Sequence, residues 1–379
     1  MRAIVVGAGI LGASVAFHLA RAGAAVTIVD AAHAGRATQA GAGIVCPWVS
    51  GIEDGAFYAL YAAGARHYPS IIAELGDFGE RDTGYSRLGA LCVAEDPRAL
   101  AAIEALARRR AAAAPEAGEV LPIRPEAAQA AFPPLAAGLG AVIVTGGARV
   151  DGRRMTASLI RAASRLGLVE RQGKATLIAE GGRVSGVRVG GETLAADLVV
   201  VTAGAWAPQL LQPLGIALPI VPQRGQLVHF GLERQDTGSW PVVLPMSTHY
   251  LVAFEGGRIV AGATREDAGF DHRVTARGLA EVLEEALRIA PGLSAATVIE
   301  ARVGFRPLAP DHRPLLGWAP GVAGLLIGNG LGSAGLTIGP YAGRLLAGMA
   351  LGETPEFDAE PFRVDRPPTG AEQGLHVLR

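Results

Sequence analysis

The first thirty residues contain a pattern that few folds accommodate: an apolar run, a glycine-rich turn, an amphipathic stretch and a second apolar run. Residues 3–6 are apolar and mostly β-branched, as in a buried parallel strand. Apolar residues recur with helical spacing over residues 10–21, and Gly23 ends the predicted helix. Residues 25–29 form a second strand that leads into Asp30. The chain therefore begins with a βαβ unit of a parallel α/β sheet.

The turn between the first strand and the helix has the residues of a dinucleotide site. Gly7 and Gly9 allow a sharp turn and a close approach of backbone to a ligand, and Gly12 lets the helix lie near the strand. The free N–H groups at the helix N-terminus attract a pyrophosphate. Asp30 lies about twenty residues further on, where a carboxylate can accept hydrogen bonds from ribose hydroxyls. A structural role for Asp30 in a turn or cap is the alternative.

Length and composition limit the class of protein. A chain of 379 residues suggests about two domains. The net charge of −1 and the pI near 6.7 give no basic surface for nucleic acid. Cys46 and Cys92 are too few and too far apart for a metal motif, and two thiols fit a reducing compartment. We therefore expect no metal and a cytoplasmic location.

Hydropathy predicts no membrane-spanning helix, because no run of roughly eighteen apolar residues lacks charge. Arg2 and the apolar run after it resemble a signal peptide, but the glycines and the second strand argue against that. Peripheral contact with the inner face of a membrane is left open. The sequence does not predict an oligomeric state.

Two later strands also run into small residues. Residues 197–206 are a buried strand followed by a small-residue turn, and residues 324–337 repeat this arrangement before a helix predicted over 338–350. Residues 34–44 form a glycine-rich loop, which is either a cofactor-facing backbone or an ordinary flexible loop. In open α/β sheets the ligand lies outside the carboxyl ends of the strands. The three glycine-rich strand ends therefore predict one shared site.

The predicted fold is α/β, with a discontinuous Rossmann-like cofactor-binding domain and a second, mostly antiparallel α+β substrate domain. Between the three strand ends, the sequence alternates as strands and hairpins, including one over 250–262 around two glycines. The predicted boundaries are 1–75, 140–215 and 298–352 for the first domain, 76–139 and 216–297 for the second, and 353–379 for a loose C-terminal tail.

Four motifs together resemble the FAD-dependent D-amino-acid oxidase family, which includes glycine and sarcosine oxidases and bacterial D-amino-acid dehydrogenases. They are residues 7–12 with Asp30, residues 199–206, Arg306-Pro307 with Pro310-Asp311, and residues 328–337. The resemblance covers nearly the whole chain and implies FAD, with its adenosine diphosphate on the first motif. It also implies that the last helix dipole stabilises the negative charge of reduced flavin.

The resemblance implies a set of cofactor-binding residues, which come from all four motifs and the glycine-rich loop. They are Gly7, Ala8, Gly9, Ile10, Leu11, Gly12, Asp30, Ala31, Arg36, Ala37, Thr38, Gly41, Ala42, Gly43, Ile44, Ala175, Ala203, Gly204, Trp206, Arg306, Gly330, Leu331, Gly332, Ser333, Ala334, Gly335, Leu336 and Thr337.

Three residues are candidates for the substrate site. By resemblance, Arg306 binds the substrate carboxylate, which suits a planar guanidinium fork, and Tyr250 adds a hydroxyl. The structural alternatives are a surface ion pair for Arg306 and edge-strand packing for Tyr250. Arg265, if it points inward, holds a second acidic group; otherwise it is solvated or paired with Glu266 or Asp267.

The expected reaction is oxidation of a small amino acid, either a D-amino acid, a glycine-like one or an N-alkylated one. Hydride transfer from the α-carbon to flavin N5 gives an imino acid, which hydrolyses to a 2-oxo acid. The electron acceptor is oxygen or a quinone. The alternatives are a 2-hydroxy acid dehydrogenase and a non-catalytic flavin-binding protein. We expect non-covalent FAD, because no cysteine lies near Arg306 or His312 in the sequence. We also expect no lysine in the pocket, because the single lysine, Lys174, lies outside the predicted pocket region.

Overall fold

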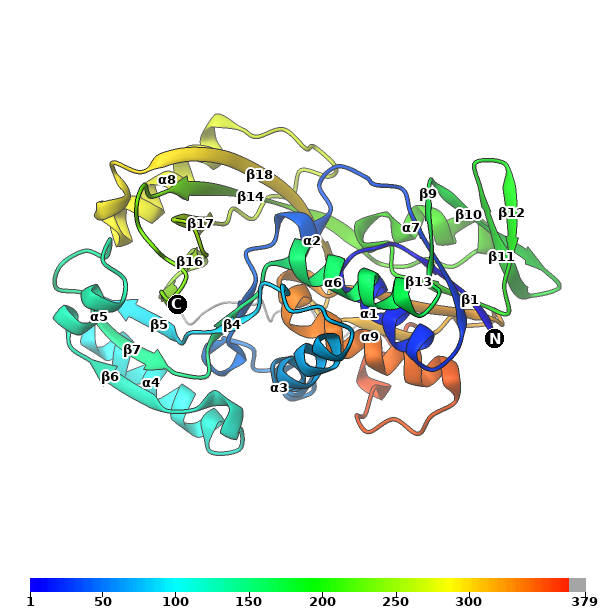
Figure 1. Ribbon diagram of the computed structural model, residues 1–379, viewed down its shortest axis with the longest axis horizontal. Coiled ribbons are helices and arrows are strands. Elements are labelled where there is room, and N and C mark those ends of the chain that lie inside the picture. The colour runs from blue at the N-terminus through cyan, green and yellow to red at the C-terminus, as the bar shows by residue number, and fades with distance from the viewer. Residues whose placement is uncertain (368–379) are drawn as a thin grey trace.

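The fold comes from a computed structural model, which describes residues 1–367. Two lobes lie along the long axis, each built on a large sheet (Figure 1). The first sheet has six strands in the order β19-β20-β13-β1-β2-β9, and only β19 is antiparallel to its neighbour. Its strands are β1 (Arg2–Val6), β2 (Ala25–Asp30), β9 (Val169–Gln172), β13 (Leu198–Val201), β19 (Leu315–Trp318) and β20 (Leu325–Asn329).

Both faces of the six-stranded sheet are buried, and alternate residues of each strand point to opposite faces. Val5 packs with the helices on one face, whereas Ile4 and Val6 pack against a small antiparallel sheet and a short helix on the other. The first face carries α1 (Ile10–Arg21), α3 (Gly55–Asp77), α6 (Gly152–Arg165) and α9 (Gly335–Leu351). The second carries β10 (Ala175–Glu180), β11 (Arg183–Val189), β12 (Glu192–Ala195) and α7 (Ala207–Leu211).

The second large sheet has eight strands in the order β18-β14-β17-β16-β15-β5-β7-β6. Helix α8 (Ala276–Ile289) covers one face, and Leu227 and Leu244 on the other face turn toward the first lobe and line the cavity described below. The strands are β5 (Ala90–Ala94), β6 (Val120–Ile123), β7 (Gly140–Val144), β14 (Val221–Gly231), β15 (Val242–Pro245), β16 (Tyr250–Ala253), β17 (Arg258–Gly262) and β18 (Thr297–Leu308). The mixed α/β fold and the hairpin at 250–262 are confirmed.

The pairing of two strands differs from the predicted domain boundaries. Residues 140–144 and 298–308 were assigned to the cofactor domain, but β7 and β18 pair with β5, β6 and β14 in the eight-stranded sheet. Sequence pattern alone does not say which sheet a strand joins, since partners lie far apart in the chain. The boundaries remain a prediction, with these two strands as exceptions.

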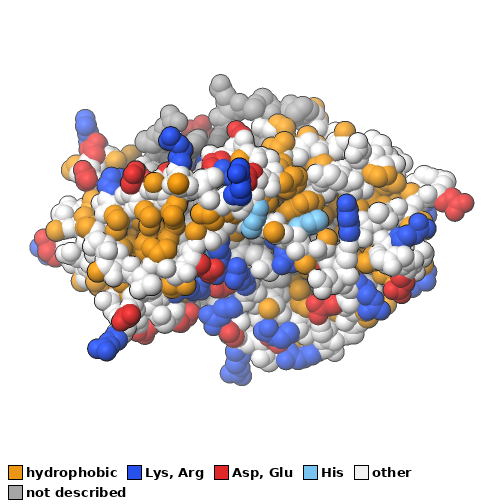
Figure 2. All heavy atoms as spheres, turned by 90° about the horizontal axis from the view of Figure 1, so that it is seen from above, with side chains coloured by type: hydrophobic (Ala, Val, Ile, Leu, Met, Phe, Trp, Pro, Cys, Tyr) orange, Lys and Arg blue, Asp and Glu red, His pale blue; other side chains and the backbone are white. Residues whose placement is uncertain are grey.

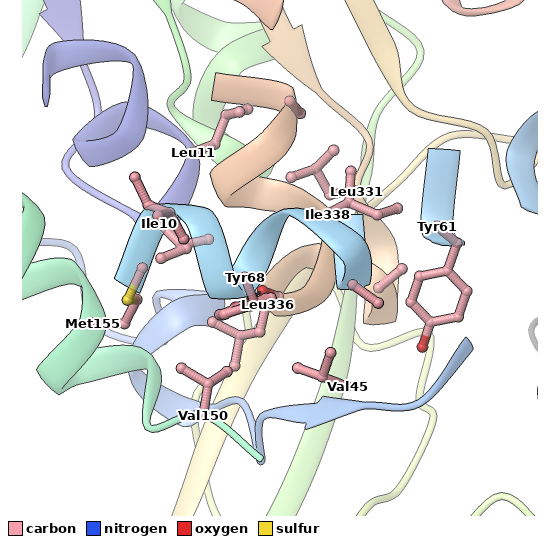
Figure 3. Packing of buried hydrophobic residues seen from close by; sticks show 14 of the residues in the cluster. Ile10, Leu11, Val45, Tyr61, Tyr68, Val150, Met155, Leu331, Leu336 and Ile338 are labelled. Carbon is pink, nitrogen blue, oxygen red and sulfur yellow. Dashed lines mark hydrogen bonds between the residues drawn. The ribbon is translucent and has the colours of Figure 1, made fainter. Parts of the chain in front are cut away.

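Several further elements complete the fold. A three-stranded sheet joins β3 (Ile44–Val45), β4 (Ser86–Arg87) and β8 (Ala148–Arg149), and helix α2 (Ala37–Ala40) follows the loop after Asp30. Residues 96–131 contain α4 (Pro97–Ala111), α5 (Pro125–Ala131) and strand β6. Figure 3 shows how Leu331, Leu336 and Ile338 before and within α9 pack beside Val45 and Tyr68.

The outer surface mixes charges of both signs, and apolar side chains gather over the lobe of the eight-stranded sheet (Figure 2). The edge strand β18 contributes Val298 and Ile299, which are both about half exposed. A register shift opposite His229 and Phe230 disrupts the ladder near this end. Such a bulge twists an edge strand and hinders pairing with another sheet edge.

The first part of the predicted loose tail is packed, which corrects that prediction. Phe362 is fully buried and stacks on Phe357, and Arg366 forms a bidentate ion pair with Asp311. The proline content suggested a loop, but local pattern did not reveal these long-range partners. Residues 368–379 of the predicted tail lie outside the described residues.

We expect Phe362→Ala to lower the free energy of unfolding by about 3 kcal/mol, because truncating a buried aromatic ring leaves a cavity. Urea unfolding followed by circular dichroism would measure the loss. Arg363→Ala serves as the control, because the carboxylates that pair with Arg363 within residues 1–367 are exposed. Equal stability of the Phe362 and Arg363 variants would contradict the packed position of this segment.

Candidate active site

A cavity of about 770 Å³ lies between the two lobes. One part is lined by Asp30 at the carboxyl edge of the six-stranded sheet and by Ala175 at the start of β10, and another by Tyr250 and Arg306 from the eight-stranded sheet. Most of the predicted cofactor residues line it, as do all three predicted substrate residues. Five predicted residues do not line the cavity: Ala8, Gly12, Gly330, Ala334 and Thr337.

The turn before α1 is closely packed against Thr202, which follows the neighbouring strand β13. Gly7 has φ = +111°, and a Cβ added there would lie 2.5 Å from the carbonyl oxygen of Thr202. A Cβ on Gly12 would lie 1.8 Å from the carbonyl oxygen of Gly7. The Thr202 hydroxyl donates to that same Gly7 oxygen at 3.0 Å. Gly12 therefore allows helix α1 to lie close to the turn and does not itself line the cavity.

The N-terminus of α1 faces the cavity without a side-chain cap from Gly9. Ile10 N–H donates to the Thr38 hydroxyl at 3.1 Å, which ties the helix to the glycine-rich loop. N–H groups at such a helix end bind a diphosphate well.

The Asp30 carboxylate holds the loop that follows β2. It accepts hydrogen bonds from the backbone N–H groups of Ala8 and Ala32, both at 2.7 Å, and from the Arg36 guanidinium at 3.0 Å. Ala8 therefore contributes by fixing Asp30. Asp30 has the turn role given as the alternative, and it also lines the cavity, where a ribose hydroxyl can reach it.

A second helix end meets the cavity at the last motif. Helix α9 starts at Gly335, three residues earlier than predicted, and its Ala334 N-cap makes no side-chain cap hydrogen bond. The Thr337 hydroxyl donates to the Ile44 carbonyl oxygen at 2.8 Å, which joins this helix to the glycine-rich loop. Two helix N-termini that face the cavity without a side-chain bond from their own N-cap residue, together with glycine-rich walls, fit a dinucleotide whose diphosphate and flavin carbonyls accept hydrogen bonds.

Arg306 lies on β18 at the inner end of the cavity. It donates to the Thr264 carbonyl oxygen at 3.1 Å and makes a longer contact of 3.5 Å with the Gln223 side-chain oxygen. A Cβ on Gly225 would lie 2.6 Å from its Nη2 atom, so only glycine leaves room for the guanidinium. Within residues 1–367, no carboxylate lies within 4.0 Å of Arg306. The surface ion pair is therefore not what holds this side chain.

Tyr250 and Arg265 lie beside Arg306 in the same cavity. Burial raises the pKa of Tyr250, and the charges of Arg306 and Arg265 oppose that rise. Burial lowers the pKa of Arg265, and the positive charge of Arg306 lowers it further. Two guanidinium groups and a phenol hydroxyl thus share one space, which favours an anionic ligand. Arg265 lines the cavity, as the inward alternative requires.

The sequence reading missed several residues of the lining. His249 lies in the turn before β16, with its Nε2 atom 3.5 Å from Glu281 Oε1, and burial lowers its pKa. Tyr61 comes from α3, and burial raises its pKa to about 12. Its place within a helix gives no local signal of access to the cavity. Lys174 also lines the cavity, next to Ala175, which corrects the expectation of a pocket without lysine; Arg306 lies on β18 of the other large sheet.

Residues 2–349 match the family model described as DAO, FAD-dependent oxidoreductase. The chain belongs to this family. It is 48% identical over 361 residues to the uncharacterized oxidoreductase YurR of Bacillus subtilis, with 95% of this chain and 97% of that protein covered. It is 32% identical over 366 residues to glycine oxidase of Pseudomonas aeruginosa, with 95% and 98% covered.

Solved structures give the same result. Iminodiacetate oxidase (IdaA) from Chelativorans sp. BNC1 is 51% identical, with a TM-score of 0.93 over 98% of this chain and 100% of that one. Glycine oxidase from Geobacillus kaustophilus is 26% identical, with a TM-score of 0.83 over 97% and 99%. The DAO-family member described here is therefore a FAD-dependent oxidoreductase acting on amine donors, and the predicted cofactor FAD is confirmed. The non-catalytic alternative is set aside.

Two findings concern features that the family does not determine. In the part of the chain that the structure describes, no helix is long and apolar enough to span a bilayer. The same residues contain no group of three His, Cys, Asp or Glu side chains arranged to hold a metal ion. Non-covalent attachment of FAD stays a prediction, as do the roles of the individual site residues.

Proposed function

We propose that this enzyme oxidises a small N-substituted amino acid that carries two carboxylates, such as iminodiacetate. The observation that carries the proposal is the pair of arginines in one cavity, Arg306 and Arg265, whose charges both act on Tyr250. A guanidinium fork binds a carboxylate bidentately, so two forks suit two carboxylates. The similarity to iminodiacetate oxidase supports the same substrate class.

The residues divide the work of binding. Arg306 takes the carboxylate on the reacting side, because Thr264 and Gln223 hold its guanidinium and Gly225 leaves space for it. Tyr250 donates its hydroxyl proton in a hydrogen bond to the same carboxylate. Arg265 takes the second carboxylate across the amine nitrogen. Fixing both ends of a small substrate fixes the carbon between them, which is what a near-attack geometry requires.

The reaction balances as a two-electron oxidation. The carbon next to nitrogen loses a hydride, the nitrogen loses a proton to solvent, and the C–N bond becomes C=N. Bound FAD supplies the two-electron acceptor, and oxygen or a quinone must later take these electrons. Water adds to the imine and releases a 2-oxo acid and an amine; from iminodiacetate these are glyoxylate and glycine.

The test is anaerobic bleaching of the flavin absorption by iminodiacetate, sarcosine, glycine, D-alanine and glycolate. We expect iminodiacetate to bleach most efficiently. Arg265→Gln should lower kcat/KM for iminodiacetate by about thirtyfold, since a hydrogen-bonded charge pair contributes about 2 kcal/mol, and leave sarcosine within about threefold. Arg273→Gln on the same segment is the control, because its side chain is 83% exposed.

Other outcomes separate the alternatives. Efficient bleaching by glycolate without bleaching by amines would favour the 2-hydroxy acid dehydrogenase. Equal use of iminodiacetate and sarcosine, with no effect of Arg265→Gln, would overturn the second carboxylate site. Admitting air after bleaching would then show whether oxygen serves as the acceptor.

A further inference from the structure

Arg265 belongs to a segment that crosses the opening between the lobes. Residues 264–274, here called the strap, leave the end of β17 and enter α8 at its Thr275 N-cap. The strap has no regular secondary structure, and most of its residues after Thr264 are exposed. A segment of this kind needs specific contacts to hold one side chain in a fixed position.

Arg224 on β14 pins the strap at two points. Its Nη2 atom donates to Glu266 Oε2 at 2.6 Å, and its Nη1 atom lies 2.9 Å from Asp271 Oδ2 and 3.2 Å from the Asp271 carbonyl oxygen. The backbones of Arg224 and Glu266 also exchange two hydrogen bonds, at 2.9 and 3.0 Å. Arg224 is buried and does not line the cavity. One guanidinium thus ties the start of the strap to its far half.

A second layer of contacts fixes the residues on either side of Arg265. Glu266 Oε1 accepts from the Thr264 hydroxyl at 2.6 Å and from the Gln226 amide at 2.7 Å. The Gln226 side chain also bonds Thr275, which closes the strap where it enters α8. The Thr264 carbonyl oxygen in turn accepts from Arg306. The strap anchor and the first carboxylate site are therefore neighbours.

The middle of the strap packs on the cofactor lobe. Phe270 stacks on Trp206 with ring centroids 5.3 Å apart, and Trp206 stacks on His33 at 4.6 Å. Trp206 and His33 both line the cavity. The strap thus reaches from the substrate end to the cofactor end, and Arg224 is its buried attachment between them.

We infer that Arg224 is a positioning residue that sets the preference for substrates with two carboxylates, because it holds the strap and so directs Arg265 into the cavity. This inference rests on the proposed function. Without Arg224 the strap keeps its two ends but loses both ion pairs, and Arg265 samples more positions. Arg306 stays on β18, and its contact with Gln223 on β14 lies outside the strap, so binding of a single carboxylate changes little.

The experiment compares Arg224→Met with Arg273→Met in the FAD-loaded enzyme. Both changes remove an arginine that pairs with Asp271, but only Arg224 is buried and contacts Glu266. We expect Arg224→Met to lower kcat/KM for iminodiacetate by about tenfold or more, since small misplacements of a binding group have large effects, mainly through KM. The value for sarcosine should stay within about threefold, and Arg273→Met should resemble wild type for both substrates.

Hydrogen exchange of residues 264–274 gives a readout independent of turnover. The exchange should become faster than in the wild type in Arg224→Met and keep the wild-type rate in Arg273→Met. Asp271→Asn, which keeps the contact between Arg224 and Glu266, should show smaller shifts in the same direction and serves if Arg224→Met does not fold.

The outcomes are distinguishable. An unchanged ratio of iminodiacetate to sarcosine efficiency in the Arg224 variant, beside an altered ratio in Arg265→Gln, would overturn this inference alone. Equal losses for both substrates would also overturn it, since they would indicate a general structural role. A wild-type enzyme with no preference and no effect of Arg265→Gln would overturn the proposed function and this inference with it.

Discussion

Arg306→Ala is expected to lower kcat/KM for every carboxylate substrate by about a hundredfold or more. The reason is the loss of a bidentate pair between a guanidinium and a carboxylate inside a partly dehydrated cavity, a contribution of about 3 kcal/mol. Arg306 has no carboxylate partner within 4.0 Å among the described residues, so its charge is available to substrate. Stopped-flow reduction of the flavin under anaerobic conditions measures the effect on the reductive step directly.

Arg306→Lys is the matched variant, because lysine keeps the charge but not the planar fork. It should fall between wild type and Arg306→Ala. Both variants should purify with a full complement of FAD, since helices α1 and α9, whose N-termini face the cofactor, pack on the six-stranded sheet and not on the sheet that carries Arg306. Turnover of sarcosine within about tenfold of wild type in Arg306→Ala would contradict the carboxylate role.

The sequence predicted the elements that carry their own local signal. The βαβ unit of residues 2–30, the hairpin at 250–262 and the glycine-rich strand ends each combine an apolar period with turn residues, and all three are present. That three strand ends would meet at one cavity was inferred from the general rule that ligands bind outside the carboxyl ends of parallel strands. No local sequence pattern shows which of these residues are in contact. This rule correctly brought Gly7, Gly204 and the last motif toward one site.

Long-range pairing was beyond the reach of the sequence. The sheet that β7 and β18 join is set by distant partners. Strand β7 pairs with β5, more than forty residues away, and β18 pairs with β14, about eighty residues away. The burial of Phe362 likewise depends on Phe357 and a distant core rather than on local pattern. His249 was missed because it comes directly before Tyr250, which was predicted to face the substrate. Since successive side chains of a strand point to opposite faces, its neighbour was expected to point away from the cavity.

The strap illustrates a further limit. Arg265 and Arg224 are forty-one positions apart, and neither carries a motif. Sequence reasoning could name Arg265 as a candidate because of its chemistry and its place after a strand, but not the buried guanidinium that holds its neighbour Glu266. Residues that bind ligands often follow strand ends, whereas residues that position them can lie anywhere in the fold.

Gly12→Ala is expected to lose both bound cofactor and stability. A Cβ at this position would lie 1.8 Å from the Gly7 carbonyl oxygen and 2.5 Å from the Thr202 hydroxyl oxygen. Neither oxygen can move aside easily, because the Gly7 oxygen belongs to the backbone and the Thr202 hydroxyl is held by hydrogen bonds to the carbonyl oxygens of Val6 and Gly7. Helix α1 must therefore move away from β1. The free energy of unfolding should fall by about 3 kcal/mol, at the upper end of overpacking effects.

The same movement displaces the N–H groups of the α1 N-terminus, on which the diphosphate depends. The variant should therefore purify with little flavin and regain it only at high FAD concentration. Gly76→Ala is the control, because Gly76 lies in helix α3 with no atom within 4 Å of an added Cβ, and alanine favours a helix over glycine. Flavin absorbance per protein and urea unfolding measure both effects. A Gly12→Ala protein with full flavin would mean that the turn tolerates a wider spacing than its contacts indicate, and that diphosphate binding does not depend on the close approach of α1 to β1.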